Sequence, residues 1–137
     1  MARDLFHQSV KTALIKDGWQ ITSDPLKIRI DRIKLEVDLA AEKVLAAEKD
    51  NQKIAVEIKS FIKPSTINDF HAALGQFLNY RLALEVTEPD RELFLAVPVD
   101  IFSSFFQETF PQMSIKKYSL KLIAYEPYLE EIVEWKK

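Results

Sequence analysis

Three ionisable residues lie within two apolar runs of the chain, at residues 35–39 and 53–61. In the second run, the alternation of a β-strand places Glu57 and Lys59 on one face and the aliphatic side chains on the other. The same alternation in the first run places Asp38 on the polar face. We expect the two runs to pair in one sheet, so that Asp38, Glu57 and Lys59 meet.

Two carboxylates and an ammonium group are the side chains that metal-dependent cleavage of a phosphodiester requires. Asp38 and Glu57 are predicted to hold Mg²⁺ (or Mn²⁺), together with the carbonyl group of Ile58 and several water molecules. The ion would activate a water molecule and stabilise the charge on the phosphoryl group. Lys59 is predicted to position that water or to neutralise the developing charge.

The alternative is an exposed strand face with an ordinary ion pair, since Glu-x-Lys occurs on many surface strands. The apolar character of residues 54–61 favours an interior strand, where charged groups are costly and mark function more often. Glu42 and Glu48 are rival carboxylates. We expect Glu48 to be solvated near a turn, and Glu42 is the second choice as a metal ligand.

A helix is predicted from Thr66 to about residue 85, after a capping segment at residues 63–66 with Ser65 or Thr66 as the N-cap. Its Gln76 and Tyr80 lie four residues apart and therefore share one face. They are expected either to support the catalytic residues, with Gln76 in the leading role, or to pack at the boundary of the core. The apolar stripe of this helix is formed by Ile67, Phe70, Leu74, Phe77, Leu78 and Leu82.

A first helix is predicted over residues 4–17, because apolar residues recur with helical spacing and Gly18 can end it in a left-handed conformation. His7 and Lys11 lie on its polar side. His7 is interpreted either as a helix-surface or boundary histidine, or as a residue facing the catalytic cleft. His71, in the later helix, is expected to pack or to face solvent.

The remaining elements follow from alternation and turn residues. A short strand over residues 19–22 ends at the turn 23–25, and a further apolar run at 93–98 predicts a buried strand parallel to its neighbour. The other predicted elements are an edge strand or loop at 26–30, an extended run at 44–49, a turn at 50–52, a short helix at 100–106 ended by Pro111, and strands at 121–125 and 131–135.

Five aromatic residues exceed the obvious needs of a small core. They are interpreted as core residues with a few surface rings, or as a protein interface for a homodimer or a partner protein. These residues are Phe102, Phe105, Phe106, Phe110 and Trp135.

The composition indicates one globular domain over residues 1–137, with 47% hydrophobic and 29% charged residues. The absence of cysteine excludes disulfides and thiolate chemistry. The chain shows no apolar run of the roughly 20 residues that a spanning helix needs, nor a signal peptide, so we expect a cytoplasmic protein without a membrane partner. The net charge of −2 predicts weak DNA binding by the isolated chain. One basic stretch would favour DNA binding locally despite this net charge. It contains Lys27, Arg29, Arg32 and Lys34.

Asp38 followed by Glu57-x-Lys59 resembles the signature of the PD-(D/E)xK nuclease superfamily, in which an Asp precedes a (D/E)-x-K strand. Val37 stands where that signature has Pro. The resemblance implies a three-layer α/β domain with a mixed central sheet flanked by helices, the restriction endonuclease-like core. It also implies a Gln directed to the cleft from the following helix, as Gln76 would be. A carboxylate often found on the first helix is replaced here by His7.

Six segments carry a further resemblance: Arg3-Asp4-x-Phe6-His7, Lys16-Asp17-Gly18-Trp19, Asp24-Pro25, 55–61, Ala73-Leu74-Gly75-Gln76-Phe77-x-x-Tyr80-Arg81 and 95–98. Through them almost the whole chain is similar to the XisH family, the fdxN-element excision controlling factors of cyanobacteria. That resemblance implies a role in excising a DNA element during heterocyst differentiation, with an XisI-family protein and a site-specific recombinase as partners. We therefore expect a magnesium-dependent DNA endonuclease-like protein, or alternatively a non-catalytic controlling factor that binds the recombinase, XisI or DNA. A third interpretation is a toxin-like module restrained by its partner.

Overall fold

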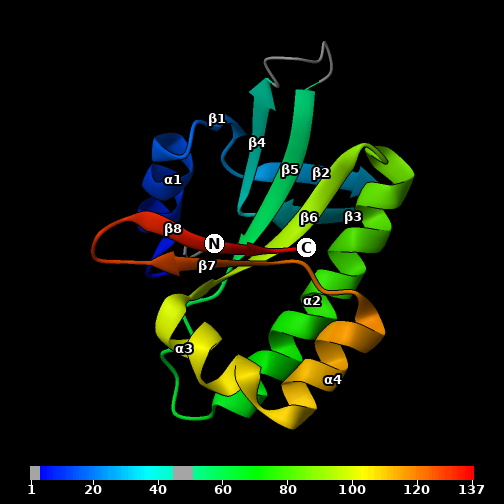
Figure 1. Ribbon diagram of the computed structural model, residues 1–137. Helices are drawn as coiled ribbons and strands as arrows, with labels where there is room; N and C mark the ends of the chain where they lie inside the picture. Colours follow the sequence, from blue (N-terminus) through cyan, green and yellow to red (C-terminus); the bar gives the residue numbers. More distant parts are fainter. Residues whose placement is uncertain (1–3, 45–50) are drawn as a thin grey trace.

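The computed structural model describes residues 4–44 and 51–137 of the chain (Figure 1). Helices cover both faces of a mixed central sheet, which confirms the predicted α/β class. In chain order the elements are α1 (His7–Lys16), β1 (Gln20–Ser23), β2 (Leu26–Ile30), β3 (Ile33–Val37), β4 (Leu39–Val44), β5 (Asn51–Ile58), α2 (Thr66–Thr87), β6 (Arg91–Pro98), α3 (Val99–Ser103), the 3-10 helix η1 (Phe105–Gln107), α4 (Thr109–Tyr118), β7 (Leu122–Glu126) and β8 (Glu131–Lys136).

The central sheet has the strand order β1-β4-β5-β6-β7-β8. Strands β5, β6 and β7 are parallel, whereas β1, β4 and β8 run antiparallel to their neighbours. Strands β2 and β3 form a separate antiparallel ribbon beside α2. The predicted hairpin of β4 and β5 and the predicted parallel strand β6 are therefore both confirmed.

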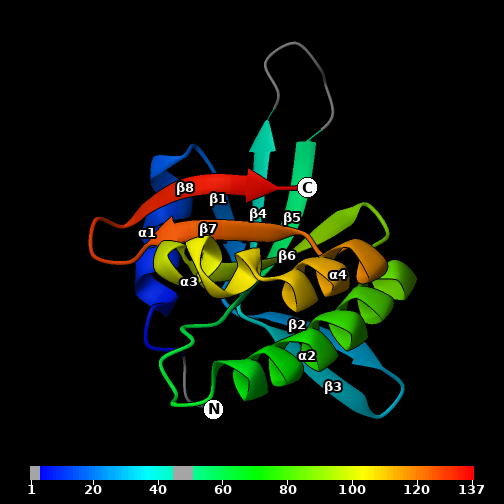
Figure 2. The same ribbon diagram turned by 60° about the horizontal axis from the view of Figure 1, so that its bottom comes forward.

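Apolar side chains form one core on each face of the sheet. On β5, Ala55 packs in the core beneath α2, while Ile54 and Val56 pack in the core on the α1 side. Helix α1 lies against β1 and β8, and α2 lies against β6 with α4 beside it (Figure 2). Since side chains alternate along a strand, Glu57 shares the face of Ala55 and is directed towards α2.

Both long helices form where the sequence predicts them. Helix α1 ends before Gly18, which has a φ of +93°, and α2 begins after Ser65, whose Oγ accepts a hydrogen bond from Asn68 N at 3.3 Å. The apolar stripe of α2 differs from the prediction. Phe70 and Phe77 are buried, but Leu82 is 61% exposed, because the buried face is centred on Ala73 and Leu84 instead.

The first apolar run is not one strand. Strand β3 ends at Val37, and Asp38 forms a bend before β4 begins at Leu39. At this bend the chain leaves the β2–β3 ribbon for the central sheet, and the alternation is broken there: Val37 packs in the core beneath α2, whereas Leu39 packs in the core on the α1 side. The second run is also shorter than predicted: β5 ends at Ile58, and Phe61 has a φ of +55°.

Two further predictions about the chain are wrong. Pro111 does not end the short helical region but lies in the first turn of α4, where the missing N–H of proline removes no hydrogen bond. The region before it is divided into α3 and η1. Residues 51 and 52, predicted in a turn, belong to β5, while residues 45–50, including Glu48, lie outside the described part of the chain.

The aromatic residues serve mainly the core. Phe102 and Phe106 are 7% and 0% exposed, and Phe105 packs edge-on against Phe106. Trp135 packs against Trp19 and Phe94 on the opposite face of the sheet. Of the five, only Phe110 is largely exposed, at 56%. Among the described residues, no helix is long and apolar enough to cross a membrane.

Candidate active site

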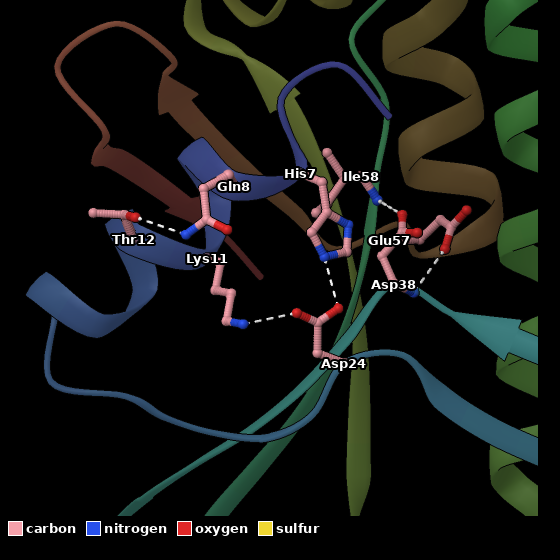
Figure 3. A network of polar contacts seen from close by, with 8 residues as sticks. All are labelled: His7, Gln8, Lys11, Thr12, Asp24, Asp38, Glu57 and Ile58. Atoms are coloured by element: carbon pink, nitrogen blue, oxygen red, sulfur yellow. Dashed lines mark hydrogen bonds and ion pairs between the residues drawn. The ribbon is translucent and has the colours of Figure 1, made fainter. Parts of the chain in front are cut away.

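Asp38 and Glu57 are brought together by the register of β4 and β5. Leu39 pairs with Val56, so the residue before β4 lies beside the end of β5. The backbone N–H of Asp38 donates a hydrogen bond to Glu57 Oε1 at 3.2 Å, and the N–H of Ile58 donates to Asp38 Oδ2 at 2.8 Å (Figure 3). Each carboxylate therefore accepts a hydrogen bond from the segment that carries the other.

Lys59 completes the predicted group of three. Its Nζ lies 3.6 Å from Glu57 Oε2, and its side chain is 27% exposed against 7% for that of Glu57. The backbone of Lys59 is fixed on both sides, because its N–H donates to Ala96 O at 3.0 Å and its carbonyl group accepts from Tyr125 Oη at 3.3 Å. The ammonium group can thus reach the solvent edge while its main chain stays in place.

Burial favours the protonated form of both carboxyl groups. Burial and then the negative charge of Asp38 raise the pKa of Glu57 to about 8. Burial likewise raises the pKa of Asp38 above its usual value. With a pKa of about 8, the Glu57 carboxyl group carries a proton at neutral pH. A cation between them would replace that proton.

This donor set fits a hard divalent cation. Two neighbouring carboxyl groups offer oxygen ligands to Mg²⁺, which keeps several water molecules in its shell. Within residues 4–44 and 51–137, no three His, Asp or Glu side chains form a metal-binding group. A cation here would therefore rest on Asp38 and Glu57 and on water.

The three residues line one cleft with a volume of about 510 Å³. The cleft lies where the end of β5, the start of α1 and the β2–β3 ribbon approach α2. The other lining residues include several that sequence reasoning missed as site residues. The full lining is Asp4, His7, Asp24, Pro25, Lys27, Glu36, Asp38, Glu57, Ile58, Lys59, Gln76 and Tyr80.

Gln76 and Tyr80 both reach this cleft from α2, as their shared helix face predicts. The side-chain oxygen of Gln76 is buried and has no hydrogen-bond partner in the described structure. Burial and then the charge of Glu57 raise the pKa of Tyr80. Both residues thus lie beside the acidic pair, with an amide group available for a ligand.

His7 is neither a surface residue nor a solvated boundary residue. It is 4% exposed, and its Nε2 lies 2.8 Å from Asp24 Oδ1, while Lys11 Nζ donates to Asp24 Oδ2 at 2.8 Å (Figure 3). The imidazole Nδ1 is buried and has no hydrogen-bond partner in the described structure. His71, in contrast, is exposed on α2, which agrees with one of its two expected positions.

Asp4 places a carboxylate in the cleft from the turn before α1, although the sequence suggested only His7 in this region. Its two oxygens accept hydrogen bonds from Phe6 N at 2.9 Å and from Ser60 N at 3.0 Å. Asp4 therefore ties the N-terminal turn to the residue after Lys59. Its position directly before a helix is typical of a residue that accepts backbone N–H groups, which is the signal that could have identified it.

Glu42 does not join the acidic pair. It pairs with Gln20 across β1 and β4, and Glu42 Oε2 lies 3.9 Å from Arg91 Nη2. It is absent from the cleft, so the second choice for a metal ligand is wrong. In the basic stretch, Lys27 lines the cleft, whereas Arg29 donates to the carbonyl group of Asp31.

Comparison with known proteins decides the family. The model of the XisH protein family matches residues 1–133. The chain belongs to the XisH family.

Two crystal structures of similar proteins support this membership. An XisH family protein from Nostoc punctiforme is 47% identical, with a TM-score of 0.87, and the match covers 98% of this chain and 100% of that one. An fdxN element excision controlling factor protein from Anabaena variabilis is 50% identical, with a TM-score of 0.88 and the same coverage. A search of curated proteins gave no match.

The XisH-family chain thus presents a compact set of groups with distinct chemical capacities. Asp38 and Glu57 offer anionic oxygens, Lys59 offers a cationic donor, and Gln76 offers an unpaired amide oxygen, all within one cleft. These groups can bind a cation, orient a water molecule and neutralise charge on a bound anion. The family name does not itself describe a reaction.

Proposed function

We propose that this XisH-family chain is a magnesium-dependent DNA endonuclease of the PD-(D/E)xK type that serves the excision of a genomic DNA element. The convergence of Asp38, Glu57 and Lys59 in one cleft supports the proposal. The name of the Anabaena variabilis relative supports the biological setting, because that protein is called an fdxN element excision controlling factor.

The acidic pair, Lys59 and Gln76 have separate roles in the proposed hydrolysis of a phosphodiester. Mg²⁺ bound to Asp38 and Glu57 would supply a Lewis acid for the phosphoryl oxygen and lower the pKa of bound water. Lys59 donates hydrogen bonds to the attacking water or to the phosphoryl oxygens, whose negative charge increases in the transition state. Gln76 positions the water through its amide group.

The alternative is a non-catalytic controlling factor that binds an XisI-family protein, a recombinase or DNA. One observation favours it: the cleft is lined by five carboxylates against two lysines. Without a cation, such a cleft repels a phosphate backbone, and the chain as a whole carries a net charge of −2. In that case the acidic pair would be a structural remnant of a nuclease fold.

Cleavage of supercoiled plasmid tests the proposal. Wild type and Lys59→Ala would be compared with Mg²⁺, Mn²⁺ or EDTA, alone and with an XisI-family protein. We expect cation-dependent nicking by the wild type and at least a ~100-fold lower rate for Lys59→Ala, since a group that stabilises the transition state is typically worth that much.

A second lysine provides the matched control. Lys117 is exposed on α4 and lies outside the cleft, so Lys117→Ala should nick plasmid at the wild-type rate. Circular dichroism would establish that both variants are folded. Nicking that persists in Lys59→Ala would point to a contaminating nuclease. Absence of nicking in every condition, with the fold intact, would establish the non-catalytic alternative.

A further inference from the structure

One side of α2 is apolar although it faces solvent. We call it the outer face of α2 and define it by Ile67, His71, Gly75, Leu78, Leu82 and Val86. Leu82 and Val86 are 61% and 66% exposed, and Ile67 is 39% exposed. Helix α2 lies at the edge of the molecule (Figure 1), and the exposed fractions of Leu82 and Val86 show that no described element covers them.

Charge is nearly absent from this side of the helix. Among the residues of α2, the outer face carries one neighbouring carboxylate, Glu85, and no lysine, while Arg81 turns aside to the carbonyl groups of Tyr118 and Ser119. Exposed Asn68 and Asn79 border the outer face, which is therefore an apolar stripe, and an exposed apolar stripe marks a contact with another molecule. Something outside the described chain is therefore expected to cover the outer face.

The glycine at position 75 indicates that the backbone of another helix packs closely against this face of α2. A glycine in the middle of a helix costs about 1 kcal/mol relative to alanine. A Cβ atom at this position would meet nothing within 4 Å, so packing inside this chain does not require the glycine. A small residue on an exposed helix face allows a second helix to pack at short distance.

The order of residues on the outer face is symmetric. Ile67 and Leu82 each lie seven residues outward from the Leu74–Gly75 pair, and His71 and Leu78 each lie three residues outward. We propose that α2 packs antiparallel against α2 of a second copy of this chain, with the two-fold axis near Leu74 and Gly75. This arrangement is self-complementary, as the interface of a two-fold dimer must be.

The symmetric pairing matches large side chains with suitable partners. Ile67 lies against the partner's Leu82, His71 against the partner's Leu78, and half-buried Leu74 against the partner's Gly75. The last of these contacts places a bulky side chain over the position without a Cβ. The spacing of three and four residues is that of helices that pack along an apolar seam.

Charge complementarity favours the antiparallel orientation. Glu85 lies ten residues beyond Gly75, so the partner's Pro64 comes opposite it, next to exposed Lys63 and the N-terminus of the partner's α2. A carboxylate is stabilised at a helix N-terminus and beside an ammonium group. A parallel pair would instead place the two Glu85 side chains together.

Molar mass in solution provides the first test and is independent of any nuclease activity. By light scattering or sedimentation equilibrium at about 100 µM, we expect twice the chain mass of 15.9 kDa. Leu82→Glu should weaken the dimer at least ~100-fold, because it buries an unpaired carboxylate. Ile15→Glu changes a residue that is 53% exposed on α1 and should leave the dimer intact.

Engineered cysteines test the orientation, since the chain has no cysteine of its own. Gly75→Cys lies near the two-fold axis and should form an intermolecular disulfide on mild oxidation. Val86→Cys is equally accessible but should not, because an antiparallel pair separates the two copies by about 34 Å along the helix.

The results that overturn the proposal are specific. A monomeric wild type, or a dimer unaffected by Leu82→Glu, would exclude the outer face of α2 as the interface. Disulfide formation by Val86→Cys as readily as by Gly75→Cys would exclude the antiparallel pairing. A monomer that binds an XisI-family protein only while Leu82 is intact would assign the face to that partner instead.

Discussion

The backbone N–H of Asp38 donates a hydrogen bond to the carboxylate of Glu57, at 3.2 Å. Asp38, which is proposed to bind the same cation as Glu57, thus also holds the Glu57 side chain in place. The two carboxyl groups lie close together in a buried place, where burial and mutual repulsion favour the protonated form. The fully ionised form of the acidic pair is therefore destabilised, and binding of a proton or a cation removes this destabilisation. The effect can be measured through its dependence on pH.

Glu57 makes the stability of the cation-free protein depend on pH. The unfolded chain releases this proton near pH 4.5, whereas the folded protein keeps it up to about pH 8. The contribution of Glu57 to the free energy of unfolding should therefore be fully present below pH 4.5 and be lost as the pH rises from 4.5 to 8, by at most about 5 kcal/mol. Urea denaturation in EDTA at several pH values would measure the fall.

Glu57→Gln removes the titrating group and should flatten this dependence. The variant should be more stable than the wild type above pH 8. Glu131→Gln, an exposed carboxyl group on β8, serves as the matched control and should keep the wild-type profile. Equal profiles for Glu57→Gln and the wild type would show that Glu57 does not carry the proton.

Cation binding should release a proton at neutral pH. Because the pKa of Glu57 is about 8 in the free protein, Mn²⁺ must displace that proton to bind both carboxylates at pH 7. Titration calorimetry in two buffers of different ionisation enthalpy should give about one proton released at pH 7 and almost none above pH 9. A proton count that does not change with pH would contradict this account.

Gln76 should matter for activity but not for stability. Its buried side-chain oxygen has no hydrogen-bond partner among the described residues, so Gln76→Leu should change the free energy of unfolding by no more than about 1 kcal/mol and can even stabilise the protein. If Gln76 positions the attacking water, plasmid nicking should fall at least ~10-fold. Strong destabilisation with unchanged nicking would assign Gln76 to packing alone.

Asp4 should stabilise the segment that carries Lys59. Asp4→Ala leaves the N–H groups of Phe6 and Ser60 without their acceptor and should cost about 1–3 kcal/mol in urea denaturation. Asp4→Asn keeps one acceptor oxygen, so its loss should be smaller. Equal losses in both variants would mean that the charge of Asp4, and not its two hydrogen bonds, holds the segment.

The alternation of apolar residues predicted the elements that position the site. Strand β5 and helix α2 form where the sequence indicates, because a buried strand and a capped helix each leave a strong local signal. That was sufficient to bring Asp38, Glu57 and Lys59 together and to place Gln76 and Tyr80 beside them. Their chemical roles remain predictions.

Contacts between distant segments could not be predicted in this way. Alternation does not reveal that the chain changes sheets at Asp38, because an extended backbone looks the same before and after the change. The pairing of His7 with Asp24 joins residues 17 positions apart through folding alone. Asp4 and Ser60 are separated by 56 positions, and neither residue carries a signal for the other.

The acidic pair and the connection between the strands lie at opposite ends of the hairpin of β4 and β5. Asp38 and Glu57 lie at one end, where Leu39 pairs with Val56, and the connection between the strands lies at the other end, beyond the pair of Val44 and Asn51. Residues inserted into that connection would lengthen the chain between the two carboxylates without changing their register. The number of residues between Asp38 and Glu57 can therefore vary during evolution without separating the two carboxylates.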